Sequence, residues 1–284
     1  MMAKIINGKE IAAEYCAVMK EQIAELKATG VTPTVAIINV HGDVASETYI
    51  KKKVELAQSL GINALIYQFE EDVSEGEIAD LINNLNHDMN VHAIVLQSPL
   101  PKKMSFRNLV NLIDPEKDVD GLTTLNQGRL FSGEPGIIPC TPLGVLHLLH
   151  FVHPHLAGMR AVVLGRSSIV GRPLAQLLLN ANCTVTLLHS YSHDLEEICR
   201  TADILVSAVG NPRFIGRNFI KKGATVIDVG ISRISENGKM KLIGDVDFDD
   251  VSEVAGAVTP VPGGVGPMTV AYLMHNTLKL ACCY

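Results

Sequence analysis

Segments with helical spacing of apolar residues alternate with short apolar runs along most of the chain. In the first half, this pattern predicts helices over residues 9–28, 45–60 and about 75–85. The short runs predict strands over 34–40, 64–69 and 92–96. Alternation of this kind is typical of βαβ units, so we expect α/β layers with largely parallel sheets.

A second α/β series follows an interruption. Residues 114–142 are rich in Gly, Pro and Asp and show poor periodicity, so we expect the crossover between two domains there. Beyond it the pattern predicts helices over 143–151 and up to about 180, and a last helix over 270–281. The expected strands are 160–164, 184–188, 204–208 and 225–229.

Composition and charge narrow the class of protein. With 284 residues, 47% of them hydrophobic, the chain can bury a core in each of two domains. A net charge of −6 without long runs of one sign argues against a broad nucleic-acid footprint. The six cysteines form no Cys-x-x-Cys pair, which indicates reduced thiols. With no signal-peptide pattern and no apolar stretch near ~18 residues, we expect a cytoplasmic protein.

The turn after the strand 160–164 is a candidate dinucleotide site. It contains Gly165 and Gly171, but Ser167 and Val170 stand where the common fingerprint has its second and third glycines. Taken alone, this pattern fits a strand-to-helix turn that binds no ligand about as well as it fits a dinucleotide site. At the end of strand 184–188 the chain carries His189 and Ser190 instead of the acidic residue of NAD sites. Arg166 and Ser190 can both contact a 2′-phosphate, which favours NADP over NAD.

Candidate catalytic residues lie in the first half. Ser46, Tyr49 and Lys53 share one face of the helix 45–60, although the lysine run 51–53 is more typical of a solvated surface. Spacing does not separate Lys52 from Lys53.

Gln97 follows a strand end, where α/β proteins build their sites. In the stretch between domains, either Asp118 or Asp120 can cap or turn the chain. Segment 259–269 is rich in Gly and Pro, and its backbone amides can line a ligand.

These segments together resemble the methylenetetrahydrofolate dehydrogenase/cyclohydrolase family, in the family's order and from about Asn7 to the end of the chain. The matching motifs are Ser46-x-x-Tyr49-x-x-x-Lys53, Gln97-x-Pro99-Leu100-Pro101, Lys117-Asp118-Val119-Asp120-Gly121, Pro139-Cys140-Thr141-Pro142, Gly165-Arg166-Ser167-x-x-Val170-Gly171-x-Pro173, His189-Ser190 and Pro260 to Thr269. Two departures are Ser98, where the family usually has an apolar residue, and Tyr191-Ser192, where Lys-Thr or a similar pair is usual.

The resemblance implies an N-terminal α/β folate-binding catalytic domain over 1–141, with the helix 270–284 packed on it. It also implies a C-terminal Rossmann-like NADP-binding domain over 142–269. The resemblance implies a homodimer with the folate site in the cleft between domains. The expected activity is the NADP-dependent oxidation of 5,10-methylenetetrahydrofolate, followed by hydrolysis to 10-formyltetrahydrofolate.

The resemblance also assigns roles to single residues. Lys53 becomes the general acid/base of the hydrolysis, Gln97 its hydrogen-bonding partner and Asp120 a ligand of the pterin. Substrate contacts are expected from Tyr49, Asp120, Pro262, Gly263 and Gly264, and cofactor contacts from Gly165, Arg166, Ser167, Ser190 and Ile231.

Alternative interpretations remain at this point. A monofunctional dehydrogenase of the same fold and a non-catalytic nucleotide-binding protein both keep the glycine turn. The histidines between 147 and 155 have partly helical spacing, but they lack a carboxylate or cysteine partner, and Pro154 breaks the helix before His155. We therefore interpret them as a surface cluster and expect no metal site.

Overall fold

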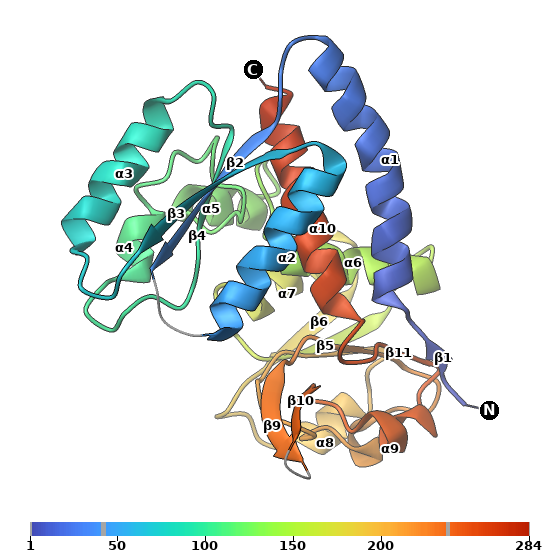
Figure 1. Cartoon of the computed structure of the whole chain (residues 1–284). Coiled ribbons are helices and arrows are strands. Elements are labelled where there is room, and N and C mark those ends of the chain that lie inside the picture. Colours follow the sequence, from blue (N-terminus) through green and yellow to red (C-terminus); the bar gives the residue numbers. More distant parts are fainter. Residues whose placement is uncertain (1, 41–43, 237–238, 284) are drawn as a thin grey trace. The chain divides into compact units, whose positions relative to one another are not determined.

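The computed structural model describes residues 2–40, 44–236 and 239–283 and divides the chain into two compact units (Figure 1). Thr141–Thr269 form one unit together with Met1–Ala13, and Glu14–Cys140 form the other together with Val270–Tyr284. From the sequence we expected residues 1–13 to belong to the first domain. In the structure they cluster with residues 141–269. Both units are α/β with mostly parallel strands, so the expected fold class is confirmed.

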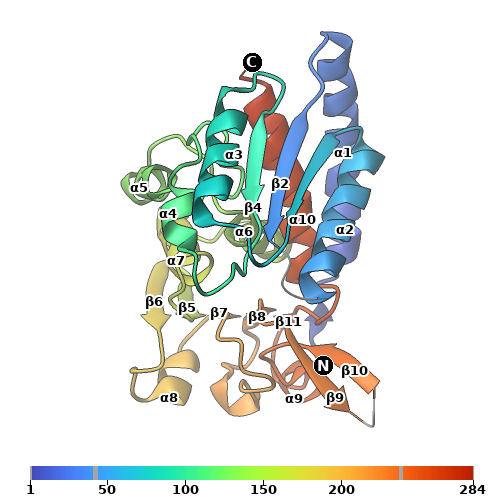
Figure 2. The same cartoon turned by 60° about the vertical axis from the view of Figure 1, so that its left-hand side comes forward.

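The 14–140 unit has a parallel sheet in the order β3-β2-β4. Its strands are β2 (Thr34–Val40), β3 (Asn63–Phe69) and β4 (Ala93–Leu96). The helices that lie wholly or partly in this unit are α1 (Gly8–Ala28), α2 (Val44–Leu60), α3 (Glu75–His87), α4 (Phe106–Val110), α5 (Thr124–Ser132) and α10 (Val265–Ala281). Figures 1 and 2 show α3 and α4 on one face of this sheet and α1 and α2 on the other.

Every residue of the central strand β2 is buried, because both of its faces are covered. Successive side chains of a strand point to opposite faces. Ala36 and Ile38 accordingly pack in one cluster with Ile78 and Ile82 of α3. The helix α3 begins at a capping box, in which Ser74 and Glu77 each bind the other's backbone N–H.

The sequence of stretch 114–142 has poor periodicity and predicted no element there, yet the stretch contains the helix α5. Thr123 accepts the backbone N–H of Asn126 at the helix start, and Gly133 ends the helix in the left-handed conformation. These caps hold a short helix with few apolar residues, which is why periodicity did not indicate it.

The 141–269 unit has a six-stranded parallel sheet in the order β1-β11-β8-β7-β5-β6. Its strands are β1 (Lys4–Ile5), β5 (Arg160–Leu164), β6 (Thr184–Leu188), β7 (Ile204–Ser207), β8 (Thr225–Asp228) and β11 (Ala257–Val258). β9 (Ser232–Glu236) and β10 (Lys239–Ile243) form a separate antiparallel pair. The helices are α6 (Cys140–Val152), α7 (Gly171–Asn180), α8 (Leu195–Cys199), the 3-10 turn η1 (Arg217–Phe219) and α9 (Phe248–Ser252).

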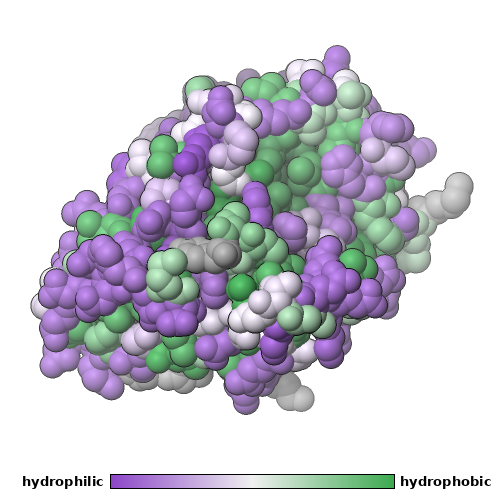
Figure 3. Space-filling model, turned by 90° about the horizontal axis from the view of Figure 1, so that it is seen from above, coloured by the Kyte–Doolittle hydropathy of each residue, from purple (hydrophilic) through white to green (hydrophobic). Residues whose placement is uncertain are grey.

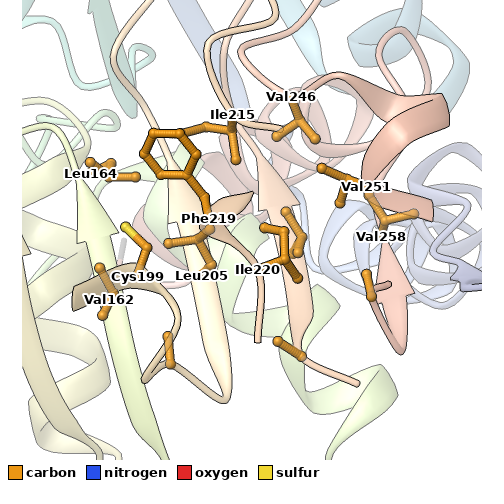
Figure 4. Packing of buried hydrophobic residues seen from close by; sticks show 14 of the residues in the cluster. Val162, Leu164, Cys199, Leu205, Ile215, Phe219, Ile220, Val246, Val251 and Val258 are labelled. Atoms are coloured by element: carbon orange, nitrogen blue, oxygen red, sulfur yellow. The ribbon is translucent and has the colours of Figure 1, made fainter. Parts of the chain in front are cut away.

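One face of this sheet packs on the cluster shown in Figure 4, in which Phe219 and Ile220 lie over Leu205 of the sheet. The alternate residues, such as Val163 and Val206, are also buried, so the sheet is covered on both faces. Because the strands are parallel, the loops that follow β5, β6, β7 and β8 all leave the same edge of the sheet. This edge is where open α/β sheets bind ligands.

Hydrophilic residues cover most of the molecular face seen in Figure 3, with hydrophobic residues as smaller areas among them. Within the described residues, no helix combines the length and the apolar composition that crossing a membrane would take.

Candidate active site and nucleotide site

Lys53 and Gln97, both expected at the site, form a direct hydrogen bond. Lys53 lies on α2 and Gln97 follows the last residue of β4. Lys53 Nζ donates to Gln97 Oε1 over 2.9 Å, and Gln97 Nε2 donates to the carbonyl of Ser98 over 2.8 Å. The bond to Ser98 orients the amide, so its oxygen faces the amine. Lys52 is exposed, and of the two neighbouring lysines it is Lys53 that makes this contact.

Asp120 is half-buried beside the thiol of Cys140. Cys140 Sγ lies 3.7 Å from Asp120 Oδ1 and 3.5 Å from the carbonyl of Val119. Burial raises the pKa of Asp120, the positive charge of Lys53 lowers it, and the negative charge of Asp118 raises it. The pKa of Cys140 lies well above its usual range, because of burial and the charge of Asp120, so the thiol keeps its proton and donates it. An amine, an amide and a carboxyl group are thus electrostatically linked within one unit.

Two buried polar residues fix the backbone around Asp120. Asp118 accepts the N–H groups of Leu122 over 3.1 Å and Thr123 over 2.8 Å, so of the two aspartates it is Asp118 that turns the chain. Asn276 on α10 donates Nδ2 to the carbonyls of Val119 over 2.9 Å and Ile138 over 3.0 Å. Sequence reasoning missed Asn276, because no local pattern relates it to a segment so distant in the chain.

Ser46 and Tyr49 lie within the helix α2, but their side chains are outside the described part of the structure. The expected contact between Tyr49 and the substrate therefore stays a prediction.

The glycine turn after β5 is built by close backbone contacts. A Cβ at Gly165 would lie 2.3 Å from the carbonyl oxygen of Ala208, and a Cβ at Gly171 would lie 1.9 Å from the carbonyl oxygen of Gly165. Both positions therefore require glycine. Ser167 Oγ accepts the N–H groups of Val170 over 3.1 Å and Gly171 over 3.3 Å, which closes the turn where α7 begins. The positive end of the α7 dipole faces this turn and favours an anion there.

Arg166, Ser190 and Ile231 are exposed beyond the carboxyl ends of the strands of the same sheet, after β5, β6 and β8 respectively. β5 and β6 are neighbours, whereas β8 lies two strands from β5. Asp228 Oδ1 accepts the N–H of Gly230 over 2.9 Å and so fixes the backbone before Ile231. Burial raises the pKa of Asp228 to about 7, against the lowering effect of its backbone N–H donors.

Pro262, Gly263 and Gly264 form the loop between β11 and α10, in the 141–269 unit. A Cβ at Gly264 would lie 2.6 Å from the carbonyl oxygen of Pro260, so this loop folds closely on itself. A cavity of about 410 Å³ borders it and is lined in part by Thr259, Pro260 and Val261. Lys53, Gln97 and Asp120 belong to the other unit.

The histidines of the 147–155 segment make contacts of an ordinary structural kind. His153 Nε2 lies 2.7 Å from Thr225 Oγ1, and burial lowers the pKa values of His147 and His153. Among the described residues, no group of three or more His, Cys, Asp or Glu is arranged to hold a metal ion.

Comparison with known proteins gives matches along nearly the whole chain. Residues 6–120 match the catalytic domain of tetrahydrofolate dehydrogenase/cyclohydrolase, and residues 139–283 match the NAD(P)-binding domain of the same proteins. A relative from Bradyrhizobium sp. strain BTAi1, called bifunctional protein FolD, is 50% identical over 99% of this chain and 97% of its own length.

Two solved structures are also similar. The bifunctional FolD methylenetetrahydrofolate dehydrogenase/cyclohydrolase from Campylobacter jejuni is 42% identical, with a TM-score of 0.96 over 99% of each chain. The FolD enzyme from Trypanosoma brucei, solved with NADP cofactor and inhibitor, is 36% identical, with a TM-score of 0.96 over 100% of this chain and 98% of that one.

Proposed function

We infer the activity from the family, because the chain belongs to the tetrahydrofolate dehydrogenase/cyclohydrolases. It is a bifunctional enzyme that oxidises 5,10-methylenetetrahydrofolate with NADP and hydrolyses the resulting 5,10-methenyltetrahydrofolate to 10-formyltetrahydrofolate. The observation that carries this conclusion at the level of residues is the hydrogen bond between Lys53 and Gln97 beside Asp120.

The oxidation step requires alignment of substrate and cofactor, but it requires no protein base. Removal of hydride from the one-carbon bridge leaves a cation that the two flanking nitrogens delocalise, so no proton has to move in this step. NADP, when bound, accepts the hydride. We propose that the chain contributes binding and orientation through Gly165, Arg166, Ser167, Ser190 and Ile231.

The hydrolysis needs a group that moves protons. Water must lose a proton as it attacks the cationic bridge, and a ring nitrogen must gain one as the bridge opens. We propose that Lys53 serves both transfers, which requires its amine to be neutral for part of the cycle. Gln97 supports this role, because it accepts a hydrogen bond from the amine without a negative charge that would hold the proton on nitrogen. A carboxylate at this position would work against the mechanism.

We propose that Asp120 binds the pterin end of the folate. Its side chain is held by the Cys140 thiol on a segment fixed by Asp118 and Asn276, which suits a residue that must keep one orientation. Tyr49 and the loop of Pro262, Gly263 and Gly264 are proposed as further substrate contacts on the family resemblance.

The test of the catalytic proposal is Lys53→Met, with Lys52→Met as a matched control on the same helix. We expect Lys53→Met to abolish hydrolysis of methenyltetrahydrofolate while NADPH formation from methylenetetrahydrofolate stays measurable, and Lys52→Met to keep both activities. Both products are followed spectrophotometrically. Normal hydrolysis by Lys53→Met would remove this residue from the role, and the same assay on the wild type separates a bifunctional enzyme from a monofunctional dehydrogenase.

We propose that Arg166 and Ser190 set the preference for NADP by binding its 2′-phosphate. The glycines keep the turn tight at the start of α7, whose N-terminus favours an anion, and neither His189 nor Ser190 adds a carboxylate that would repel the phosphate. We expect Arg166→Ala to raise the KM for NADP much more than the KM for NAD. An equal rise for both cofactors would exclude the 2′-phosphate contact.

A homodimer is proposed from the family resemblance, and light scattering should then give twice the 30.6 kDa mass of the chain. A cytoplasmic location is proposed because the cysteines are free and four of them are buried, as in a reducing compartment. Cell fractionation tests this location.

A further inference from the structure

Arg166 and Tyr191 meet at the edge of the nucleotide-binding sheet. Arg166 follows β5, and Tyr191 lies three residues beyond β6, the neighbouring strand. The guanidinium carbon of Arg166 lies over the ring of Tyr191, 5.7 Å from its centroid. This distance is within the range in which a cation is attracted to the face of an aromatic ring. The contact joins the two loops that carry Arg166 and Ser190.

The loop that carries Tyr191 is held by its own hydrogen bonds. The N–H of His189 donates to Ser192 Oγ over 3.0 Å, and the N–H of Ser192 donates to the carbonyl of His189 over 2.8 Å. The N–H of Tyr191 donates to His189 Nδ1 over 3.2 Å, and the rings of His189 and Tyr191 meet edge to face with centroids 6.2 Å apart. The tyrosine ring therefore has a defined neighbour on each side, Arg166 and His189.

Neither side chain is buried in the core. Tyr191 is 77% exposed and Arg166 is also exposed, so the ring contributes little to the core. Within the described residues, Arg166 takes part in no ion pair, and its N–H groups are not committed to a carboxylate. A large exposed ring beside an uncommitted arginine, at the edge where a cofactor binds, points to a role in ligand binding.

We propose that Tyr191 is a specificity-determining positioning residue, which holds the Arg166 guanidinium where the 2′-phosphate of NADP binds. The proposal rests on the 2′-phosphate contact of Arg166 proposed above. An arginine side chain loses much rotamer freedom when it binds a ligand, and a contact that restricts it beforehand reduces that loss. The ring face attracts the cation without using its N–H donors, which stay available to phosphate oxygens. Tyr191 then favours NADP without touching the phosphate.

The experiment compares two small probes by calorimetry on the full chain. Adenosine 2′,5′-bisphosphate carries the 2′-phosphate and adenosine 5′-monophosphate lacks it, and neither contains nicotinamide. We expect Tyr191→Ala to weaken binding of the bisphosphate by about two- to fivefold and to leave the monophosphate unchanged. Tyr191→Phe keeps the ring and should bind both probes as the wild type does. A merely structural role of Tyr191 would not depend on the 2′-phosphate.

A double-mutant comparison shows whether the effect passes through Arg166. In the Arg166→Ala background, Tyr191→Ala should cause no further loss of bisphosphate binding. A loss that persists in that background, an equal loss for both probes, or no loss at all would overturn the proposal. Arg166→Ala alone reports on the underlying contact. If it leaves bisphosphate binding intact, the 2′-phosphate role of Arg166 fails and the proposal for Tyr191 fails with it, whereas folate oxidation is untouched by that result.

Discussion

Replacing Asn276 by alanine should destabilise the 14–140 unit without touching a ligand. The side chain is 2% exposed, and its Nδ2 donates to the carbonyls of Val119 and Ile138. Each carbonyl left buried without this donor costs about 1–3 kcal/mol. Val119 still shares the single proton of the Cys140 thiol with Asp120, which puts its cost toward the lower end. The expected loss is therefore about 2–4 kcal/mol, or a fall of about 5–15 °C in Tm.

Thermal unfolding measured by circular dichroism gives the shift, and Thr277→Val is the matched control on the same helix. Thr277 is also fully buried, but its Oγ1 donates only to the Leu273 carbonyl within α10, so its loss should cost about 1 kcal/mol or less. Hydrolysis of methenyltetrahydrofolate should fall in Asn276→Ala because Asp120 is less firmly held, while NADP binding should persist. A Tm for Asn276→Ala no lower than that of Thr277→Val would refute the reasoning.

Three further outcomes are expected. Gly171→Ala should raise the KM for NADP by about tenfold or more, since the new Cβ meets the Gly165 carbonyl; steady-state kinetics with an unchanged KM would contradict this. Gly128→Ala, in open space on α5, should raise the free energy of unfolding in urea by about 0.5–1 kcal/mol. Gly133→Ala, at the left-handed C-cap of the same helix, should lower it, and a similar change in both variants would argue against the conformational explanation. Iodoacetamide at pH 8 should label the exposed Cys282 and Cys283 first by mass spectrometry, because burial keeps the Cys140 thiol protonated; early labelling of Cys140 would oppose this.

The longer strands of both sheets could be predicted closely from the sequence, whereas the two-residue strands β1 and β11 were missed. β2 and β5 begin and end where the apolar runs do, because parallel strands covered on both faces consist largely of continuous buried residues. The short elements could not be predicted in the same way. β9 alternates between partly buried and exposed residues, and α5 depends on its caps, so neither has a long apolar pattern.

The candidate site was only partly accessible from sequence. Gln97 could be singled out because it directly follows a strand, but spacing left Lys52 and Lys53 equivalent until the hydrogen bond to Gln97 separated them. The contact of Cys140 with Asp120, and that of Asn276 with Val119, join residues far apart in the chain. No local periodicity records such contacts, since they arise only when the strands and helices pack.

The hydrogen bonds that hold the Asp120 segment have a consequence for interpreting genetic variation. With Asp120 in its proposed role, substitutions at Asp118 or Asn276 would affect pterin binding only through the backbone, yet both would lower folate turnover. A growth-based screen would score them alongside direct ligand contacts. Measuring protein abundance in parallel would separate the two groups, because variants of the supporting residues lose folded protein, whereas a Lys53 variant keeps it.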